Sequence, residues 1–65
     1  MKFKIDDEVT IVKSKYGDLN LVIGQKGIVK FCWDVSTQGR QQPEYDIEID
    51  GRHWLVSEDE IGNSF

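Results

Sequence analysis

The sequence predicts an all-β domain with four or five short strands and one capped helical turn. Apolar residues recur with a period of two in several short segments, the pattern of strands with one buried and one solvated face. Turn residues separate these segments at short intervals. No segment with a helical period exceeds a turn or two. This count implies a small barrel or roll, in which closure also removes aggregation-prone strand edges.

The first strand is expected within Phe3–Lys13, after a turn at residues 6–7. Val9 and Ile11 would face one side of the sheet, and Thr10 and Val12 would face the other. Ser14–Asn20 is a polar loop whose bend falls at residues 17–18. The N-terminal part of the chain therefore supplies one strand and a loop.

A glycine-bounded turn divides the next segment into two parts. Leu21–Ile23 is a short apolar run, and Gly24–Gly27 is a turn whose two glycines suit positive φ or close backbone approach. Gly27–Trp33 is rich in β-branched and aromatic residues and predicts a strong strand. The ten residues of Asp34–Pro43 are polar and aperiodic, and this connection is either a mobile tip or a recognition loop.

The segment Glu44–Ile61 predicts a hairpin followed by a capped turn. The dipeptide at residues 50–51, Asp-Gly, favours a type I′ turn, because both of its central residues need positive φ. That turn pairs Glu48 with His53, Ile47 with Trp54 and Tyr45 with Val56. Tyr45, Ile47, Ile49, Trp54 and Val56 would then share the core face, with Trp54 as the central aromatic. Asp46, Glu48 and His53 would share the opposite face.

The residues after the hairpin carry a helix-start signal. Ser57 followed three positions later by Glu60 is a capping box, in which each side chain accepts from the other residue's amide. The apolar Ile61 comes directly after it. We expect one short 3₁₀ turn near the C-terminus.

Length and composition narrow the class of protein. Sixty-five residues make one domain, covering residues 1–65, with a single small core. One cysteine excludes an internal disulfide and favours a reducing compartment. The chain has no apolar run that would span a membrane and no signal peptide, so we expect a complete small cytoplasmic protein that is not attached to a membrane.

The net charge of −4 is unevenly distributed. Residues 1–30 hold six lysines and four acids, a balance of +2, and residues 31–65 hold two arginines and eight acids, a balance of −6. Two interpretations are open. Both halves simply have solvated faces, or one acidic face docks on a basic partner.

Three segments resemble SH3-like barrels of the KOW type. The opening F-K-I-D-D-E-V-T-I-V resembles the start of such barrels, and G-Q-K-G-I-V-K-F resembles the turn and strand of the KOW motif. Y-D-I-E-I-D-G-R-H-W-L-V-S-E-D-E-I resembles the closing hairpin and 3₁₀ turn. The resemblance covers residues 3–61 and is strongest to small stand-alone proteins of bacterial and phage genomes. The photosystem I accessory subunit and the variable chain of ferredoxin–thioredoxin reductase share this layout.

The resemblance implies a five-stranded SH3-like barrel and a general binding role, and nothing more specific. KOW domains that bind RNA are usually basic, and this chain is acidic. Our first hypothesis is a non-enzymatic module that docks on a larger cytoplasmic protein through its acidic hairpin face. The size and charge would also fit a phage or mobile-element protein that modulates a host machine. The expected partner-binding residues are Trp33, Arg40, Glu44, Asp46, Glu48 and His53.

The alternative hypothesis is a KOW-type nucleic-acid or ribosome-associated module. Its phosphate contacts would come from basic residues of the N-terminal half, together with one tyrosine. These residues are Lys13, Lys15, Tyr16, Lys26 and Lys30. Nucleic-acid binding would need the lysines in one contiguous patch, whereas protein docking would need the acidic row to be exposed.

No catalytic, cofactor or metal signature is present in the sequence. Cys32 and His53 are the only soft ligands and supply half of a zinc site. If Phe31 and Trp33 faced the core, Cys32 would point outward. We expect it to be a structural or incidental thiol, and the alternative is a reactive or metal-bound thiol. Seven acids lie within residues 44–60, but those on a strand form a row and not a calcium cage. His53 opposite Glu48 has a plain interpretation as a charge-compatible cross-strand pair.

Overall fold

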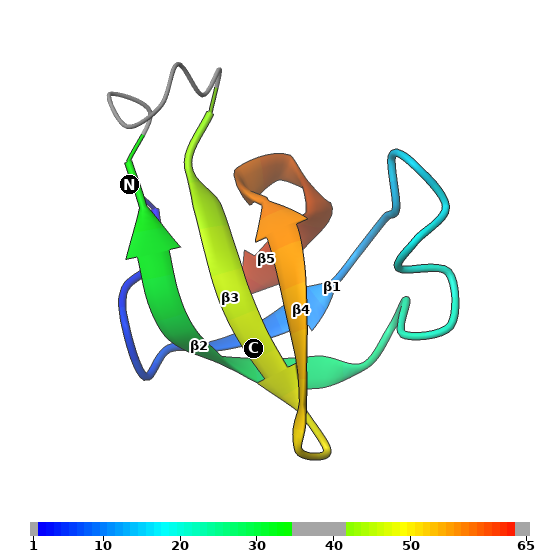
Figure 1. Ribbon diagram of the computed structural model, residues 1–65, viewed down its shortest axis with the longest axis horizontal. Helices are drawn as coiled ribbons and strands as arrows, with labels where there is room; N and C mark the ends of the chain where they lie inside the picture. Colours follow the sequence, from blue (N-terminus) through cyan, green and yellow to red (C-terminus); the bar gives the residue numbers. More distant parts are fainter. Residues whose placement is uncertain (1, 35–41, 64–65) are drawn as a thin grey trace.

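A computed structural model describes residues 2–34 and 42–63. Within these ranges, the backbone forms five strands and one 3₁₀ turn and contains no α-helix. The strands make a single antiparallel sheet in the order β4-β3-β2-β1-β5 (Figure 1). The elements are β1 (Glu8–Ile11), β2 (Lys26–Trp33), β3 (Glu44–Ile49), β4 (Arg52–Ser57), η1 (Glu58–Glu60) and β5 (Ile61–Asn63). The all-β class, the five strands and the 3₁₀ turn are confirmed.

The long strand β2 joins the two parts of the sheet. Its first residues pair with β1, where Gly27 lies opposite Val9. Its later residues pair with β3, where Cys32 lies opposite Tyr45. β1 also pairs with β5, so the last strand returns to the first (Figure 1). β4 and β5 are the two ends of the sheet, and no ladder joins them in the described part of the chain.

The hairpin between β3 and β4 has the predicted register. Ile47 pairs with Trp54, and Glu48 pairs with His53. Asp50 and Gly51 have φ values of 50° and 80°, the two positive values that a type I′ turn requires. The turn therefore determines which side chains of both strands reach the core.

The core lies on the concave side of the sheet, and its apolar side chains come from every strand. Tyr45 is its central aromatic residue, and the Phe3 ring packs edge-on against it with centroids 5.6 Å apart. Trp54 is only half-buried and packs against the edge of the cluster, which corrects its expected central place. The buried apolar residues are Phe3, Val9, Ile11, Leu19, Val22, Val29, Tyr45, Ile47, Ile49, Val56 and Ile61.

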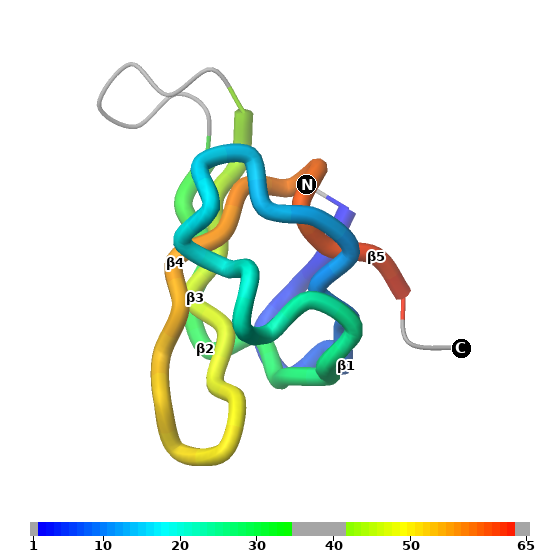
Figure 2. The backbone as a smooth tube through the Cα atoms, turned by 90° about the vertical axis from the view of Figure 1, so that its right-hand side faces the viewer, coloured from blue at the N-terminus to red at the C-terminus, as the bar shows by residue number. Residues whose placement is uncertain are grey.

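Residues 14–25 form turns and add two buried side chains to the core. Leu19 and Val22 are buried, whereas Leu21 and Ile23 are exposed, and the apolar run at 21–23 is part of a turn. The hydroxyl of Ser14 accepts a hydrogen bond from the amide of Leu19 at 2.9 Å, which closes this loop. The loop projects to one side of the sheet, beside β4 (Figure 2).

Both glycines of the predicted turn have the expected roles. Gly24 has a φ of 88°, and no other group lies within 4 Å of where its Cβ would be. Gly27 makes the close approach, because a Cβ there would lie 2.8 Å from the carbonyl oxygen of Glu48. This approach lets β2 and β3 meet at the crowded corner of the sheet.

The capping box is confirmed and holds η1 against the core. The carboxylate of Glu60 is buried and accepts a hydrogen bond from the amide of Ser57 at 2.8 Å. Its other oxygen accepts from the amide of Lys15 at 2.9 Å. The buried charge is thereby satisfied by backbone donors from two separate segments.

Candidate functional site

A β-bulge in β2 determines which side chains reach the convex side of the sheet. Val29 pairs with Ile47 and Phe31 pairs with Asp46, so Lys30 is the extra residue. After the bulge the alternation changes phase, because one residue has no partner across the ladder. Phe31 and Trp33 therefore lie on the convex side, so the condition under which Cys32 would point outward is not met.

Cys32 is correspondingly on the core side. Its Sγ lies 4.0 Å from the carbonyl oxygen of Phe3, and the side chain packs against the core cluster. Burial, together with the nearby charge of Asp7, raises the pKa of this thiol. A raised pKa and partial burial make it a poor nucleophile at neutral pH.

Two cross-strand rows bring the convex-side residues together. One row contains Phe31, Asp46 and Leu55, and the other contains Ile28, Glu48 and His53. We call these six residues, together with Trp33 and Glu44, the convex face. It combines apolar and acidic side chains on neighbouring strands β2, β3 and β4.

The apolar part of the convex face is exposed to solvent. Phe31 is 49% exposed and Leu55 is 54% exposed, on either side of Asp46. The Phe31 and Trp33 rings pack at 62° with centroids 4.7 Å apart. Exposed aromatic and aliphatic groups of this kind are typical of protein-contact surfaces.

His53 contacts both acidic side chains at the centre of the convex face. Its Nδ1 lies 2.9 Å from Oδ2 of Asp46, and its Nε2 lies 3.9 Å from Oε2 of Glu48. The nearest partner of His53 is thus the diagonal Asp46 and not the directly opposite Glu48. Lys30 Nζ approaches Glu48 to 3.8 Å from the bulge. The acids are partly exposed and partly paired within the face.

The structure brings most of the predicted partner-binding residues onto one surface. Trp33, Glu44, Asp46, Glu48 and His53 all lie on the convex face. Arg40 lies outside the described residues, as does most of the connection at 34–43.

Phe31 and Leu55 also belong to this face, and sequence analysis did not identify them. The hairpin register alone would have placed Leu55 there, beside Asp46. Nothing in the sequence indicates the bulge that exposes Phe31.

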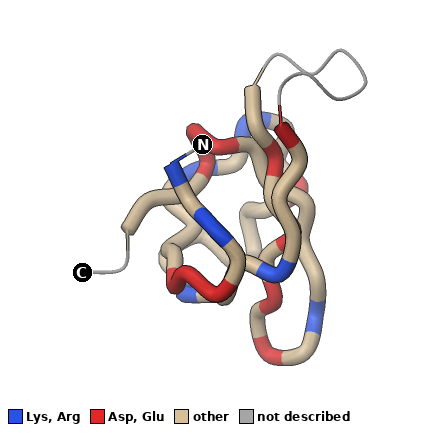
Figure 3. Tube along the Cα trace, turned by 90° about the vertical axis from the view of Figure 1, so that its left-hand side faces the viewer, with Lys and Arg blue, Asp and Glu red and all other residues tan. Residues whose placement is uncertain are grey.

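The predicted nucleic-acid residues lie at three places. Lys26 is the exposed first residue of β2, opposite Thr10 of β1. Lys13 and Lys15 lie beside η1, where their Nζ atoms approach the carboxylate of Asp59 to 3.5 and 3.3 Å. Tyr16 is exposed next to them, and the Lys15 Nζ lies 5.8 Å from its ring centroid. Lys30 lies elsewhere, at the β2 bulge, where it pairs with Glu48 of the convex face. Acidic and basic segments are interspersed along the traced chain (Figure 3).

The neighbouring lysines change the pKa of the Asp59 carboxylate. Burial slightly opposes its ionisation, but the hydrogen bond and charge of Lys15, with the charge of Lys13, lower its pKa. The two cations are therefore already partly neutralised within the molecule. Among residues 2–34 and 42–63, no three side chains of the metal-ligating types are grouped for metal binding.

A buried hydroxyl joins the core to η1. The Tyr45 hydroxyl donates to Oε2 of Glu58 at 2.6 Å, and the amide of Lys2 donates to the same oxygen at 3.0 Å. Burial and this hydrogen bond strongly raise the pKa of Tyr45. Burial acts to raise the pKa of Glu58, but the donors from Lys2 and Tyr45 outweigh it and lower that pKa. These contacts support the end of β4 from behind the convex face.

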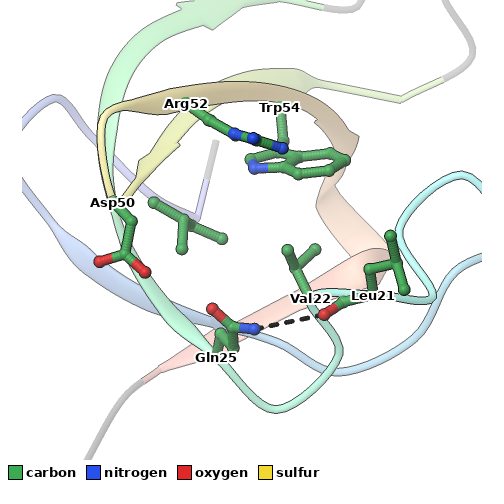
Figure 4. Close-up of a pocket in the computed structure, with 7 residues that line it drawn as sticks. Leu21, Val22, Gln25, Asp50, Arg52 and Trp54 are labelled. Atoms are coloured by element: carbon green, nitrogen blue, oxygen red, sulfur yellow. Dashed lines mark hydrogen bonds between the residues drawn. The ribbon is translucent and has the colours of Figure 1, made fainter.

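A pocket of about 250 Å³ lies at the other end of β4. Its walls come from the turn at residues 21–25 and from the tip of the β3–β4 hairpin (Figure 4). The indole of Trp54 lies across it from Val22 and Leu21. The indole nitrogen Nε1 is buried and has no hydrogen-bond acceptor in the described part of the chain.

The chain matches no protein-family model, no curated protein and no solved structure. Within residues 2–34 and 42–63, no helix has the length and apolar character needed to cross a bilayer.

Proposed function

We propose that this chain is a non-enzymatic protein-binding module that docks through its convex face on a larger cytoplasmic protein. The observation that carries the proposal is the position of Phe31 and Leu55 on either side of Asp46. An exposed apolar centre with acids around it matches the anatomy of a protein interface, where apolar groups supply affinity and charges steer the encounter. A partner with a basic rim around an apolar patch would complement it.

The fold that we propose is a small SH3-like barrel of bacterial or phage type. Three features support it: the five-strand order, the 3₁₀ turn between β4 and β5, and the return of β5 to β1. The size and net charge of −4 fit a modulator of a host machine, encoded by a phage or a mobile element. The lone cysteine supports a reducing, cytoplasmic location.

The alternative function is a KOW-type nucleic-acid or ribosome-associated module. One observation favours it: Tyr16 is exposed beside Lys13 and Lys15, and an exposed ring next to cations can stack on a base. Against it, both lysines share the carboxylate of Asp59, and Lys30 pairs with Glu48 on the far side of the sheet. A phosphate chain would have to displace these acids.

The test is affinity capture from the source cell, followed by titration of the purified partner. Wild type is compared with a convex-face variant, Leu55→Ser with Asp46→Lys, and with a lysine variant, Lys13→Glu with Lys26→Glu. We expect the convex-face variant to lose at least tenfold in affinity. Single charge reversals should slow association and change its salt dependence. The lysine variant should bind the partner nearly as wild type does.

Direct binding to nucleic acid would contradict the proposal. The free protein is titrated with plain RNA and with duplex DNA at about 0.1 M salt, where phosphate contacts dominate. Tight binding that disappears in the lysine variant and persists in the convex-face variant would establish the alternative. Circular dichroism of both variants checks that each retains the fold.

A further inference from the structure

One edge of the sheet is open for pairing. β4 is the outermost strand in the sheet order, and its six residues pair with β3 without a break in register. Figure 2 shows β4 along one side of the molecule. The opposite edge is β5, which has only three residues and offers little pairing length. β4 is therefore the edge on which a further strand could form.

The hairpin register establishes which backbone groups of β4 point outward. In a two-residue hairpin the residues flanking the turn, Ile49 and Arg52, exchange hydrogen bonds with each other. Alternation then directs the amide and carbonyl groups of His53 and Leu55 away from β3. Within residues 2–34 and 42–63, no backbone hydrogen bond outside the sheet ladder involves either residue. Two consecutive pairing positions are thus available.

This edge lacks most of the usual protections against pairing. Natural edges are blunted by proline, by charged side chains, by a bulge or by a covering segment. β4 contains no proline and no lysine, its register with β3 has no bulge, and its one arginine, Arg52, lies next to the turn. Leu55, one of the two residues whose backbone groups point outward, is 54% exposed. An edge of this kind is a template for an extended peptide.

The 250 Å³ pocket lies on the core side of the same edge. Trp54 is the inward-facing residue between His53 and Leu55, and its indole forms one wall. Leu21 forms part of the opposite wall and is 87% exposed, and Gln25, Asp50 and Arg52 add polar groups to the lining. A residue paired opposite Trp54 would direct its side chain into this space, because opposite residues share a face of the sheet.

We propose that β4 accepts an extended segment of the protein partner as an additional antiparallel strand, with one apolar side chain of that segment in the pocket beside Trp54. This inference rests on the proposed docking function and specifies its mode. Main-chain hydrogen bonds at His53 and Leu55 hold the segment, and the pocket selects the apolar residue.

The acids of β3 determine which residues are preferred on either side of the pocket residue in the partner's segment. The side chains that alternate with the pocket residue lie on the convex side, next to Leu55 and His53. Asp46 and Glu48 lie directly behind those two residues on β3. The preferred segment therefore alternates apolar and basic residues, with the basic ones on the convex side.

A synthetic peptide tests this inference directly. The probe is a capped heptapeptide in which lysine and leucine alternate, titrated into ¹⁵N-labelled protein. We expect the His53 and Leu55 amides to gain protection from hydrogen exchange on binding, since both become paired. N-methylation of the lysine amides, which face β4, should weaken binding at least tenfold. N-methylation of the leucine amides, which face away from β4, should leave it within twofold.

Two protein variants test the pocket with a matched pair of changes. Leu21→Asp places a charge at the pocket wall, and Ile23→Asp places one on an exposed residue of the same turn that does not line the pocket. Both side chains are exposed, so we expect both proteins to fold. Leu21→Asp should weaken the peptide at least fivefold, and Ile23→Asp should have no measurable effect.

Three results would overturn the inference. The first is absence of peptide binding at millimolar concentration. The second is peptide binding that gives the His53 and Leu55 amides no protection from hydrogen exchange. If that binding is lost in the convex-face variant, the proposed docking function is retained but strand addition is not its mode. The third is protection that already rises with protein concentration in the absence of peptide, which would assign the edge to a second copy of the chain.

Discussion

Replacing Gly27 with alanine should destabilise the domain through steric overlap with β3. Gly27 is buried in β2, and a Cβ there would collide with Cγ2 of Ile47 and would lie 2.7 Å from Cγ1 of Ile49 and 2.8 Å from the Glu48 carbonyl oxygen. Its φ is outside the left-handed region, so backbone strain does not contribute. Overpacking of this kind costs about 1–3 kcal/mol. The lower entropy of the unfolded alanine chain offsets about 0.5–1 kcal/mol.

The net cost should be about 2 kcal/mol, because one of the contacts is backbone and cannot move aside like a flexible side chain. For a domain of this size, that corresponds to a fall in Tm of about 10 °C. Urea unfolding followed by tryptophan fluorescence, with thermal unfolding by circular dichroism, measures both quantities. The m-value should stay constant, since the exposed area on unfolding is unchanged.

Gly62→Ala is the matched control for this substitution. Gly62 also lies in a strand, but a Cβ there would meet its nearest neighbour, Cγ1 of Val12, at an ordinary 3.5 Å. The free energy of unfolding of the Gly62→Ala variant should therefore stay unchanged or rise by about 0.5 kcal/mol. Equal effects of the two alanines would refute the close approach of β2 and β3 at Gly27.

Three further substitutions test the hairpin and the core. Gly51→Val should cost about 1–3 kcal/mol in urea unfolding, because a β-branched residue is strained at a φ of 80°. Trp54→Ala should cost about 2 kcal/mol and retain a cooperative melt, because this side chain is half-buried at the edge of the core. Tyr45→Phe should cost about 1–2 kcal/mol through loss of the bond to Glu58. The raised pKa of Tyr45 means that its contribution is present below about pH 10 and is lost as pH rises above that value. The lowered pKa of Glu58 means that its contribution is present above about pH 4.3 and is lost as pH falls. Tyr45→Phe should therefore weaken the alkaline loss of stability, measured by urea unfolding between pH 8 and 11.

Local signals in the sequence were sufficient for the hairpin and its capped turn. The Asp-Gly turn determined the pairing of Ile47 with Trp54, and the register then followed residue by residue. Ser57 and Glu60 indicated the 3₁₀ turn because a capping box depends only on residues three positions apart. These features depend on interactions between residues that are close together in the sequence, so the sequence pattern alone predicts them.

Features that depend on long-range pairing could not be predicted in the same way. The bulge at Lys30 lies just beyond the part of β2 that pairs with β1, and no turn residue marks it. Tyr45 replaced Trp54 as the central aromatic because Phe3, distant in sequence, packs against it. The apolar run at 21–23 lies in a turn, and it buries Val22 and exposes the residues on either side.

The bulge at Lys30 also links the fold to the proposed binding mode. Without it, regular alternation from Val29 would direct Phe31 and Trp33 into the core. With it, Cys32 takes the core position opposite Tyr45, and the two aromatic rings join Leu55 on the convex side. The apolar centre of the convex face is therefore adjacent to the open edge of β4, because Leu55 belongs to both. A segment paired on that edge would extend the same surface, so one leucine connects the docking face with the strand-addition site.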